Sequence, residues 1–166
     1  DGALRHEDST GTTEILPAGG IQRMSAGTGI RHAEFNASDE TPVHFLQIWL
    51  LPKRLGIAPE YEQLETNSEQ RFGQWLNVVT PDGRGETVSI NQDAGMWLSR
   101  LSVGQSAIHS IDDGRVAYLF VATGSAAVDN MFLGPGDALE ITGESILTIE
   151  GRANVELVLF DLPAIV

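Results

Sequence analysis

Turn-forming residues recur at short, regular intervals along this chain of 166 residues, and they restrict its fold more than any other feature. The segments between them are rich in β-branched and aromatic residues, as in 116–121 and 155–162, and few hold a helical period for three turns. The turn signals are Ser9–Gly11, Pro17–Gly20, Gly27–Gly29, Asp82–Gly83, Asp113–Gly114, Thr123–Gly124, Asp129–Asn130, Gly134–Asp137, Gly143 and Gly151. Short strands between such turns are typical of antiparallel sandwiches and barrels, so we expect an all-β protein.

The segment 61–75 is the exception, because its apolar side chains fall near a helical stripe. Tyr61, Leu64, Phe72 and Trp75 are separated by Glu, Gln, Asn and Ser residues. We expect a short helix there. It would connect two β units, residues 1–60 and residues 76–166.

The two units share an order of features: a glycine, a hairpin turn, a leucine, a glycine-rich turn and then a strand. The first unit has these at Gly2, 9–12, Leu16 and 17–20, and the second at Gly124, 129–130, Leu133 and 134–137. This weak repeat suggests that one β-barrel unit was duplicated.

The composition excludes several classes of partner and site. The formal net charge is −13 with only 10 Lys and Arg residues, which disfavours direct binding to nucleic acid or anionic lipid. The chain has no cysteine, so any metal must be held by nitrogen and oxygen, and a reducing, cytoplasmic location is expected. The longest apolar stretch, Val43–Pro52, contains His44 and Gln47 and is shorter than the roughly 20 residues of a membrane helix.

One imidazole and one carboxylate share a face of a predicted strand. Side chains two apart in a strand point the same way, so His32 and Glu34 lie together while Ala33 and Phe35 face the other side. Such a pair is half of a nitrogen and oxygen metal site. The alternative is a strand whose polar face simply meets water, because His-x-Glu is common by chance.

The residues around this pair resemble a known family. Gly29, His32 and Asn36 have the spacing of the second half of the second cupin motif. The string Gln22–Asn36 followed by Pro42–Pro52 resembles the pirin family of the cupin superfamily almost throughout. More diffuse similarity continues through 61–63, 81–83, 92–94, 134–137 and 159–163. The resemblance implies a double cupin of two β-barrel or jelly-roll units, with residues 1–60 as the remainder of the N-terminal cupin, 61–75 as a helical connector and 76–166 as the C-terminal cupin.

The resemblance also implies a metal site. Pirins hold their metal with three histidines and one glutamate, and an upstream His-x-His supplies two of those histidines. Here His32 and Glu34 match two of the four positions, and we expect the segment with the histidine pair to be missing before Asp1. The expected cofactor is a divalent metal, Fe(II) first, with Mn, Ni, Cu or Zn as alternatives. We expect metal binding and activity to be weak or absent in such a fragment.

The remaining histidines are expected to play other parts. His6, beside two acidic residues, is interpreted as a solvated hairpin residue, with a ligand role at the barrel mouth as the less favoured alternative. His44 is interpreted as a hydrogen-bonded core histidine in an apolar strand, and His109 is isolated. The second cupin is therefore expected to be metal-free, with Glu140, Glu144 and Glu150 as surface charge.

Two further patterns lie near the pair. Met24, Phe35, Phe45, Ile48 and Trp49 are candidates to line a pocket for a flat aromatic substrate, although filling a barrel core is the better interpretation for most of them. The Gly27–Gly29 turn lacks the helix and lysine that a phosphate-binding loop requires.

The function that the resemblance implies is quercetin 2,3-dioxygenase activity, in which dioxygen opens the ring of a flavonol-like aromatic substrate. Glu34 would serve as a ligand and, if it swings off the metal, as the base that takes the 3-hydroxyl proton, whereas His32 would remain a ligand. The first alternative is a non-catalytic regulator that binds a transcription factor or a metabolic enzyme. A seed-storage or sugar-binding cupin is a second alternative, which the pirin-like string disfavours.

Overall fold

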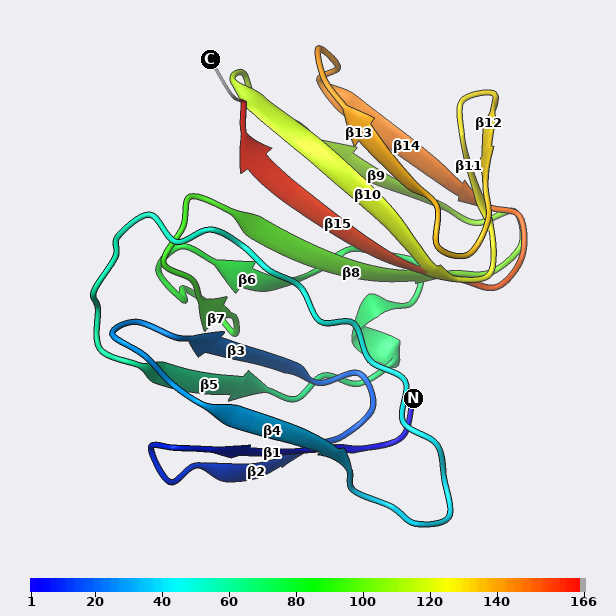
Figure 1. Cartoon of the computed structure of the whole chain (residues 1–166). Helices are drawn as coiled ribbons and strands as arrows, with labels where there is room; N and C mark the ends of the chain where they lie inside the picture. The colour runs from blue at the N-terminus through cyan, green and yellow to red at the C-terminus, as the bar shows by residue number, and fades with distance from the viewer. Residues whose placement is uncertain (165–166) are drawn as a thin grey trace. The chain divides into compact units, whose positions relative to one another are not determined.

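The computed structural model describes residues 1–164, and strands form nearly all of its regular structure (Figure 1). The prediction of an all-β chain is confirmed. The chain divides into two compact units: unit 1 contains Asp1–Asn67 and Pro81–Gln92, and unit 2 contains Ser68–Thr80 and the residues from Asp93 onward. Unit 1 thus includes a late segment that the expected boundaries assigned to the second unit.

Unit 1 is built on two small antiparallel sheets, one of order β2-β1-β4 and one that pairs β3 with β5. Its strands are β1 (Leu4–Asp8), β2 (Thr13–Leu16), β3 (Ile21–Ser25), β4 (His32–Asn36), β5 (Glu60–Leu64) and β7 (Val88–Ser89). The hairpin between β1 and β2 closes on Asp8, whose Oδ1 accepts hydrogen bonds from the backbone N–H of Thr10 (2.8 Å) and of Thr12 (3.2 Å). This turn sets the register of β1 at its carboxyl end.

An arginine ties the late segment 81–92 to the β3-β5 sheet. Arg23 on β3 donates from Nη2 to Glu62 Oε2 (2.7 Å) and from Nε to the Ser89 carbonyl oxygen (2.8 Å). Ser89 in turn donates to Glu62 Oε2 from its backbone N–H (3.0 Å) and its hydroxyl (2.9 Å). These bonds explain why residues so far along the chain belong to unit 1.

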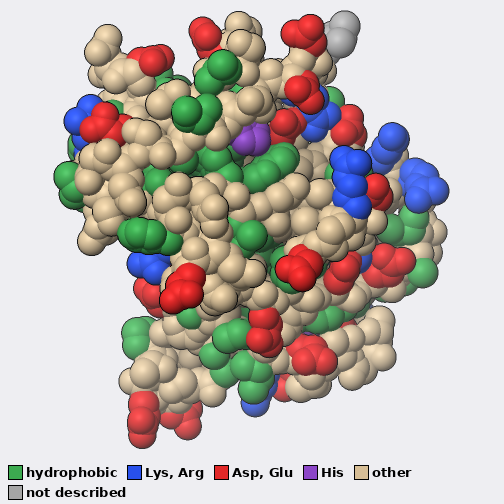
Figure 2. All heavy atoms as spheres, turned by 180° about the vertical axis from the view of Figure 1, so that it is seen from behind, with side chains coloured by type: hydrophobic (Ala, Val, Ile, Leu, Met, Phe, Trp, Pro, Cys, Tyr) green, Lys and Arg blue, Asp and Glu red, His purple; other side chains and the backbone are tan. Residues whose placement is uncertain are grey.

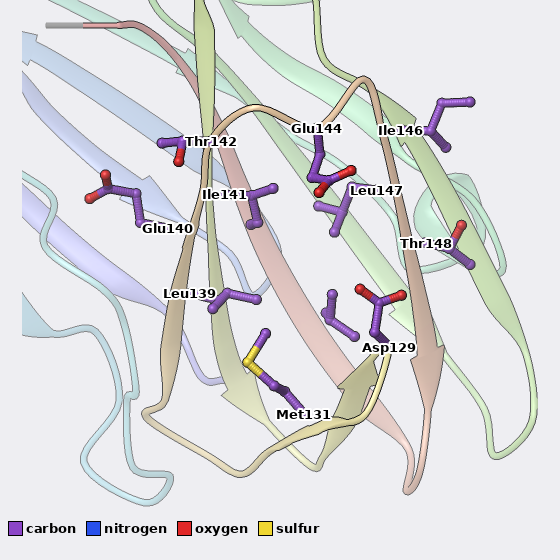
Figure 3. Close-up of a pocket in the computed structure, with 11 residues that line it drawn as sticks. Asp129, Met131, Leu139, Glu140, Ile141, Thr142, Glu144, Ile146, Leu147 and Thr148 are labelled. Carbon is purple, nitrogen blue, oxygen red and sulfur yellow. The ribbon is translucent and has the colours of Figure 1, made fainter.

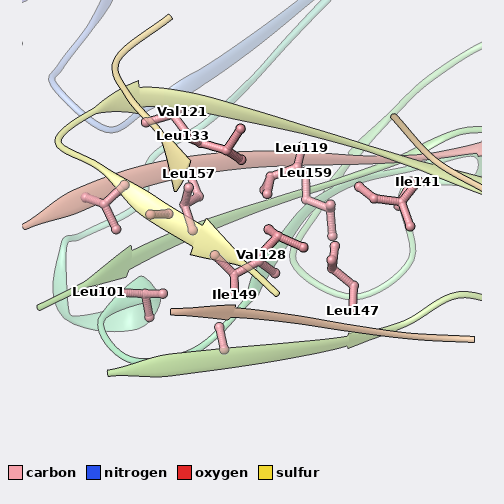
Figure 4. Packing of buried hydrophobic residues seen from close by; sticks show 14 of the residues in the cluster. Leu101, Leu119, Val121, Val128, Leu133, Ile141, Leu147, Ile149, Leu157 and Leu159 are labelled. Atoms are coloured by element: carbon pink, nitrogen blue, oxygen red, sulfur yellow. The ribbon is translucent and has the colours of Figure 1, made fainter. Parts of the chain in front are cut away.

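Unit 2 contains two sheets whose inward faces carry its hydrophobic core. One sheet has the order β13-β10-β15-β8-β6 within this unit, and the other has the order β12-β11-β14-β9. The elements are the 3-10 helix η1 (Glu69–Arg71), β6 (Leu76–Thr80), β8 (Gly95–Leu101), β9 (Ser106–Ser110), β10 (Arg115–Thr123), β11 (Ala126–Val128), β12 (Met131–Leu133), β13 (Ala138–Ile141), β14 (Ile146–Gly151) and β15 (Val155–Pro163). Leu101, Leu119, Ile149, Leu157 and Leu159 are almost fully buried in this core (Figure 4).

The expected helix at 61–75 is wrong. Glu60–Leu64 is the strand β5, and the only helix among residues 1–164 is the three-residue η1, Glu69–Arg71. The helical spacing arose from side chains that belong to different elements: Tyr61 lies in a strand, whereas Phe72 follows η1 and is 53% exposed. No helix in the described part of the chain is long and apolar enough to cross a membrane.

The apolar stretch 43–52 is not a strand either. No regular element is assigned between β4 and β5, and His44, Trp49 and Leu51 are all exposed. The interpretation of His44 as a core histidine is therefore wrong. Its backbone instead exchanges two hydrogen bonds of 2.9 Å with Asp1, through the His44 N–H and the amino group of Asp1.

Truncation of a core leucine should destabilise unit 2. Leu159→Ala removes a side chain with 0% exposure and should lower the free energy of unfolding by about 2–5 kcal/mol, because a cavity remains in a packed core. The same substitution at Leu55, which is 87% exposed, should change it by less than about 0.5 kcal/mol. Urea unfolding of both variants measures the difference, and equal effects would contradict the assigned core.

The stability of unit 1 should depend on the ionisation of Glu62. Partial burial alone would raise the pKa of Glu62, but hydrogen bonds from Ser89 and Arg23 lower it below its ordinary value of 4.5. A lowered folded-state pKa stabilises the fold above pH 4.5, and this contribution is lost as the pH falls through the folded-state pKa. Glu62→Gln should flatten the dependence of unfolding free energy on pH in this range, whereas Glu65→Gln at an exposed position should leave the slope as in the wild type.

Candidate functional site

Strands β1 and β4 place four polar side chains on one face of their sheet. In their antiparallel register His6 lies opposite Glu34 and Asp8 lies opposite His32. Directly opposed residues share a face, and residues two apart along a strand also share it. His32 and Glu34 therefore point to the same side, together with His6 and Asp8.

The intervening residues occupy the other face. Arg5 lies opposite Phe35, and its guanidinium carbon is 4.8 Å from the centroid of the Phe35 ring. This cation–π contact is possible only with this alternation, because a slip of one residue would exchange the two faces. The same-face arrangement expected for His32 and Glu34 is present.

The turn before β4 requires glycine. Gly27 has φ of +55°, and a Cβ on it would lie 2.2 Å from the Ile57 carbonyl oxygen. Gly29 has φ of +131°, and its N–H donates to the Ala26 carbonyl oxygen (2.8 Å). No helix follows this turn, since β4 begins at His32. The glycines therefore allow the tight turn that leads into β4 at His32, and they do not form a phosphate-binding loop.

His6 is the buried centre of the polar face, so its interpretation as a solvated hairpin residue is wrong. The side chains of His6 and Asp8 have 0% exposure. The His6 ring stacks on His32 with centroids 5.6 Å apart, and it lies 4.8 Å from the ring centroid of Tyr61 on β5. The acidic neighbours of His6 do not place it in solvent. Glu7 points to the opposite face, and Asp8 accepts the hydrogen bonds of the turn.

Gln22 and Tyr61 complete the site, although no local pattern predicts a functional role for either. Gln22 Nε2 on β3 donates to Glu34 Oε1 (2.7 Å) and contacts His6 Nδ1 (3.4 Å). The Tyr61 hydroxyl lies 3.2 Å from Gln22 Oε1 and 2.9 Å from Gln63 Oε1. Only the alternation of Tyr61 and Gln63 along residues 60–64 could have indicated that both lie on one face of a strand.

The electrostatics of this site favour an ionised Asp8 and a neutral Tyr61. The Thr10 hydroxyl donates to Asp8 and, with His6 and two backbone N–H groups, holds the pKa of Asp8 well below its ordinary range although burial opposes this. Burial of Tyr61, followed by the charges of Glu14, Asp8 and Glu34, raises its pKa to about 12. On the face shown in Figure 2, the Asp and Glu side chains are scattered rather than gathered in one patch.

The donors of this site fit a divalent metal in type but not in number. An imidazole and a carboxylate suit Fe, Mn, Ni, Cu or Zn, and His32 is exposed while Glu34 is half-buried. Within residues 1–164, no group of three or more His, Asp or Glu side chains is arranged to hold a metal. His6 contacts Gln22 through Nδ1 and Asp8 through Nε2 (3.2 Å), so neither ring nitrogen is directed at His32 and Glu34 as a ligand.

Most of the side chains expected to line a substrate pocket or fill a core are exposed. Phe35, Phe45, Ile48 and Trp49 are between 42% and 87% exposed, and Phe35 lies on the face opposite His32. Met24 is half-buried in β3. A shallow depression of about 430 Å³ is lined instead by Ser9 and by Gly29, Ile30 and Arg31 just before β4.

Unit 2 repeats the three-strand arrangement of the site but fills it with apolar side chains. The order β12-β11-β14 matches β2-β1-β4, and Val128 lies opposite Ile149 as His6 lies opposite Glu34. Val128, Leu147 and Ile149 are buried. Glu140 and Glu144 are exposed, and Glu150 pairs with Arg152 (3.0 Å).

Neither the surroundings of His109 nor the pocket between β13 and β14 resembles the polar face of unit 1. His109 packs edge-on against Trp97 with centroids 4.8 Å apart, and burial lowers its pKa although Asp161 opposes the shift. A pocket of about 300 Å³ lies between β13 and β14, where Leu139 and Leu147 point inward and Glu144 lies near the rim (Figure 3). The pocket lining includes no histidine.

Comparison with known proteins adds two family matches and several relatives. A model described as Pirin matches residues 1–50, and one described as Quercetinase C-terminal cupin domain matches residues 77–162. Quercetin 2,3-dioxygenase of Escherichia coli K12 is 36% identical over 165 residues, which cover 99% of this chain and 70% of that protein. A putative quercetin 2,3-dioxygenase of Pasteurella multocida is 42% identical over 164 residues, covering 97% and 69% of the two chains.

Solved structures of bacterial pirins also match this chain. The crystal structure of YhhW from Escherichia coli matches with a TM-score of 0.91 and 34% identity, over 99% of this chain and 69% of that one. The bacterial pirin YhhW in complex with nickel(II) matches with a TM-score of 0.86 and 32% identity, over 99% and 70%. These matches confirm the predicted double-cupin fold, apart from the connecting helix.

Ionisation of Tyr61 should require strongly alkaline solution. Absorbance at 295 nm, as the difference between wild type and Tyr61→Phe, should show a midpoint at about pH 12. The raised folded-state pKa means that Tyr61 stabilises the fold below pH 10, and that this contribution is lost as the pH rises through about 12. Tyr118→Phe, which removes the other tyrosine, is the control, and a Tyr61 midpoint near 10 would contradict the enclosed position of its phenol.

Proposed function

Because the chain belongs to the pirin family, we propose that it takes part in quercetin 2,3-dioxygenase chemistry, with His32 and Glu34 as two ligands of a divalent metal. One observation carries the proposal: β4 presents this imidazole and this carboxylate on one face, and Gln22 holds Glu34 by a 2.7 Å hydrogen bond. The remaining ligand positions would be filled by solvent, substrate or groups outside residues 1–164.

The relatives support both the cofactor and the substrate class. Several are named quercetin 2,3-dioxygenase or putative quercetin 2,3-dioxygenase, and a bacterial pirin was solved with nickel(II). They support a divalent metal cofactor, for which we propose Fe(II) first and Mn, Ni, Cu or Zn as alternatives. The substrates would be dioxygen and a flavonol-like aromatic molecule.

The residues of the site have distinct parts in this chemistry. A bound divalent ion would supply a Lewis acid that lowers the pKa of a coordinated hydroxyl group. Glu34 keeps Oε1 on the Gln22 amide, so Oε2 would be the oxygen that binds the ion and that, when the carboxylate leaves the ion, accepts the 3-hydroxyl proton of the flavonol. His32 remains a ligand, and its exposed ring leaves room for the substrate to approach.

The proposal predicts that both ligands are needed for metal and turnover. With only His32 and Glu34 as ligands from this chain, the wild type should bind metal weakly and turn quercetin over slowly. Glu34→Gln should lower that kcat by about 10²–10⁴-fold because the general base is lost, and His32→Ala should weaken metal binding at least about tenfold. Metal content by mass spectrometry and oxygen-dependent quercetin loss measure these effects on this chain, beside the Escherichia coli relative as a positive control.

Glu7→Gln is the matched control, because Glu7 lies on β1 but pairs outward with Arg5 (3.2 Å). It should change neither metal content nor turnover. Unchanged metal content and turnover in both site variants would show that His32 and Glu34 are not the site. Metal-dependent capture of a protein without flavonol turnover would support the regulatory alternative instead.

A further inference from the structure

We propose that Gln22 is a positioning residue that fixes the Glu34 carboxylate for metal binding, and that His6 and Tyr61 in turn fix Gln22. The inference rests on the proposed function, because it concerns how Glu34 is presented to a divalent metal. It assigns a role to three side chains that neither the motif around His32 nor the charge pattern singles out.

The neighbours of Gln22 select one orientation of its amide, with the single Tyr61 hydroxyl proton shared between Gln22 Oε1 and the nearer Gln63 Oε1. A primary amide carries two N–H donors and one oxygen acceptor. Here Nε2 faces two acceptors, Glu34 Oε1 at 2.7 Å and His6 Nδ1 at 3.4 Å, and Oε1 faces the Tyr61 hydroxyl at 3.2 Å. The flipped amide would set its oxygen against the Glu34 carboxylate, so the partners select the orientation.

The same geometry assigns the proton on His6. Because Nδ1 accepts from the Gln22 amide, the ring proton resides on Nε2, which donates to Asp8 Oδ2 (3.2 Å). Asp8 is held through its other oxygen by the Thr10 hydroxyl and two backbone N–H groups. A continuous set of hydrogen bonds therefore runs from the β1-β2 turn through His6 and Gln22 to Glu34.

The hydrogen-bonded set is buried at His6 and Asp8. His6 and Asp8 have 0% exposure, and the His6 ring is enclosed by the rings of His32 and Tyr61. Glu34 is half-buried, and without Gln22 its carboxylate would be free to take other rotamers. Hydrogen-bonded partners of metal ligands typically contribute 10–100-fold in metal affinity, and Gln22 stands in that relation to Glu34.

The chain offers a matched control on the neighbouring strand. Gln63 on β5 lies directly opposite Gln22 and also contacts the Tyr61 hydroxyl (2.9 Å), but its Nε2 donates to the Ile15 carbonyl oxygen (3.2 Å). Gln22→Met and Gln63→Met therefore make the same chemical change, and only the first removes a donor from Glu34.

The first measurement needs no metal. In nitrogen-15 NMR spectra of the free protein, the Gln22 side-chain amide protons should be shifted downfield and exchange slowly, and Glu34→Ala should reverse the shift of one of them. Tyr61→Phe should speed their exchange. If Glu34→Ala leaves both resonances unchanged, the Gln22–Glu34 bond is absent and the inference is overturned.

The second measurement uses nickel(II) as the probe, with dissociation constants from chelator competition. Gln22→Met should weaken nickel binding by about 10–100-fold, with Gln63→Met within about threefold of wild type and both variants matched in thermal stability. In a Glu34→Gln background, Gln22→Met should have no further effect. An equal effect of Gln22→Met in both backgrounds, or equal effects of the two methionine variants, would overturn the inference.

The two measurements separate this inference from the proposed function. If wild type binds no nickel and consumes no quercetin, the proposed function fails, and the metal-free NMR result alone decides whether Gln22 positions Glu34. If wild type binds nickel and Gln22→Met does so equally well, the metal site stands and the positioning role is wrong.

Discussion

The antiparallel register between β1 and β4 is the constraint on which the candidate site depends. It sets His6 against Glu34 and Asp8 against His32, and it sends Arg5 and Phe35 to the other face. Because side chains alternate with a period of two, a slip of one residue would exchange the polar and the outward sets. The Asp8 turn at one end and the Arg5–Phe35 contact on the outer face hold the register in place.

The two units place different kinds of side chain in the same strand arrangement, polar in unit 1 and apolar in unit 2. Both contain a three-strand arrangement with a central inward pair, His6 with Glu34 in one and Val128 with Ile149 in the other. A buried polar group is tolerated only when hydrogen bonds replace those it made to water. Unit 1 meets that requirement through Gln22 and its partners, whereas unit 2 avoids it with apolar side chains that extend its core.

Two local patterns, apolar spacing and neighbouring charge, do not indicate where a segment packs. The helix expected at 61–75 and the core strand expected at 43–52 were inferred from apolar spacing, which does not show where a segment packs. Glu60–Leu64 became a strand because β3 offered a pairing edge, and residues around Trp49 remained exposed. His6 was misplaced because its acidic neighbours indicated solvent, although alternation buries every second residue of β1.

Local rules were enough to determine the all-β character of the chain, the nitrogen and oxygen chemistry open to it, and the shared face of His32 and Glu34. Alternation along a strand and the need for glycine in tight turns act over a few residues, so the sequence alone carries them. Only the tertiary structure decided that His6, Gln22 and Tyr61 meet beside Glu34. The Tyr61–Gln22 contact joins residues 39 apart in the chain, and such pairings depend on which strands become neighbours rather than on any local pattern.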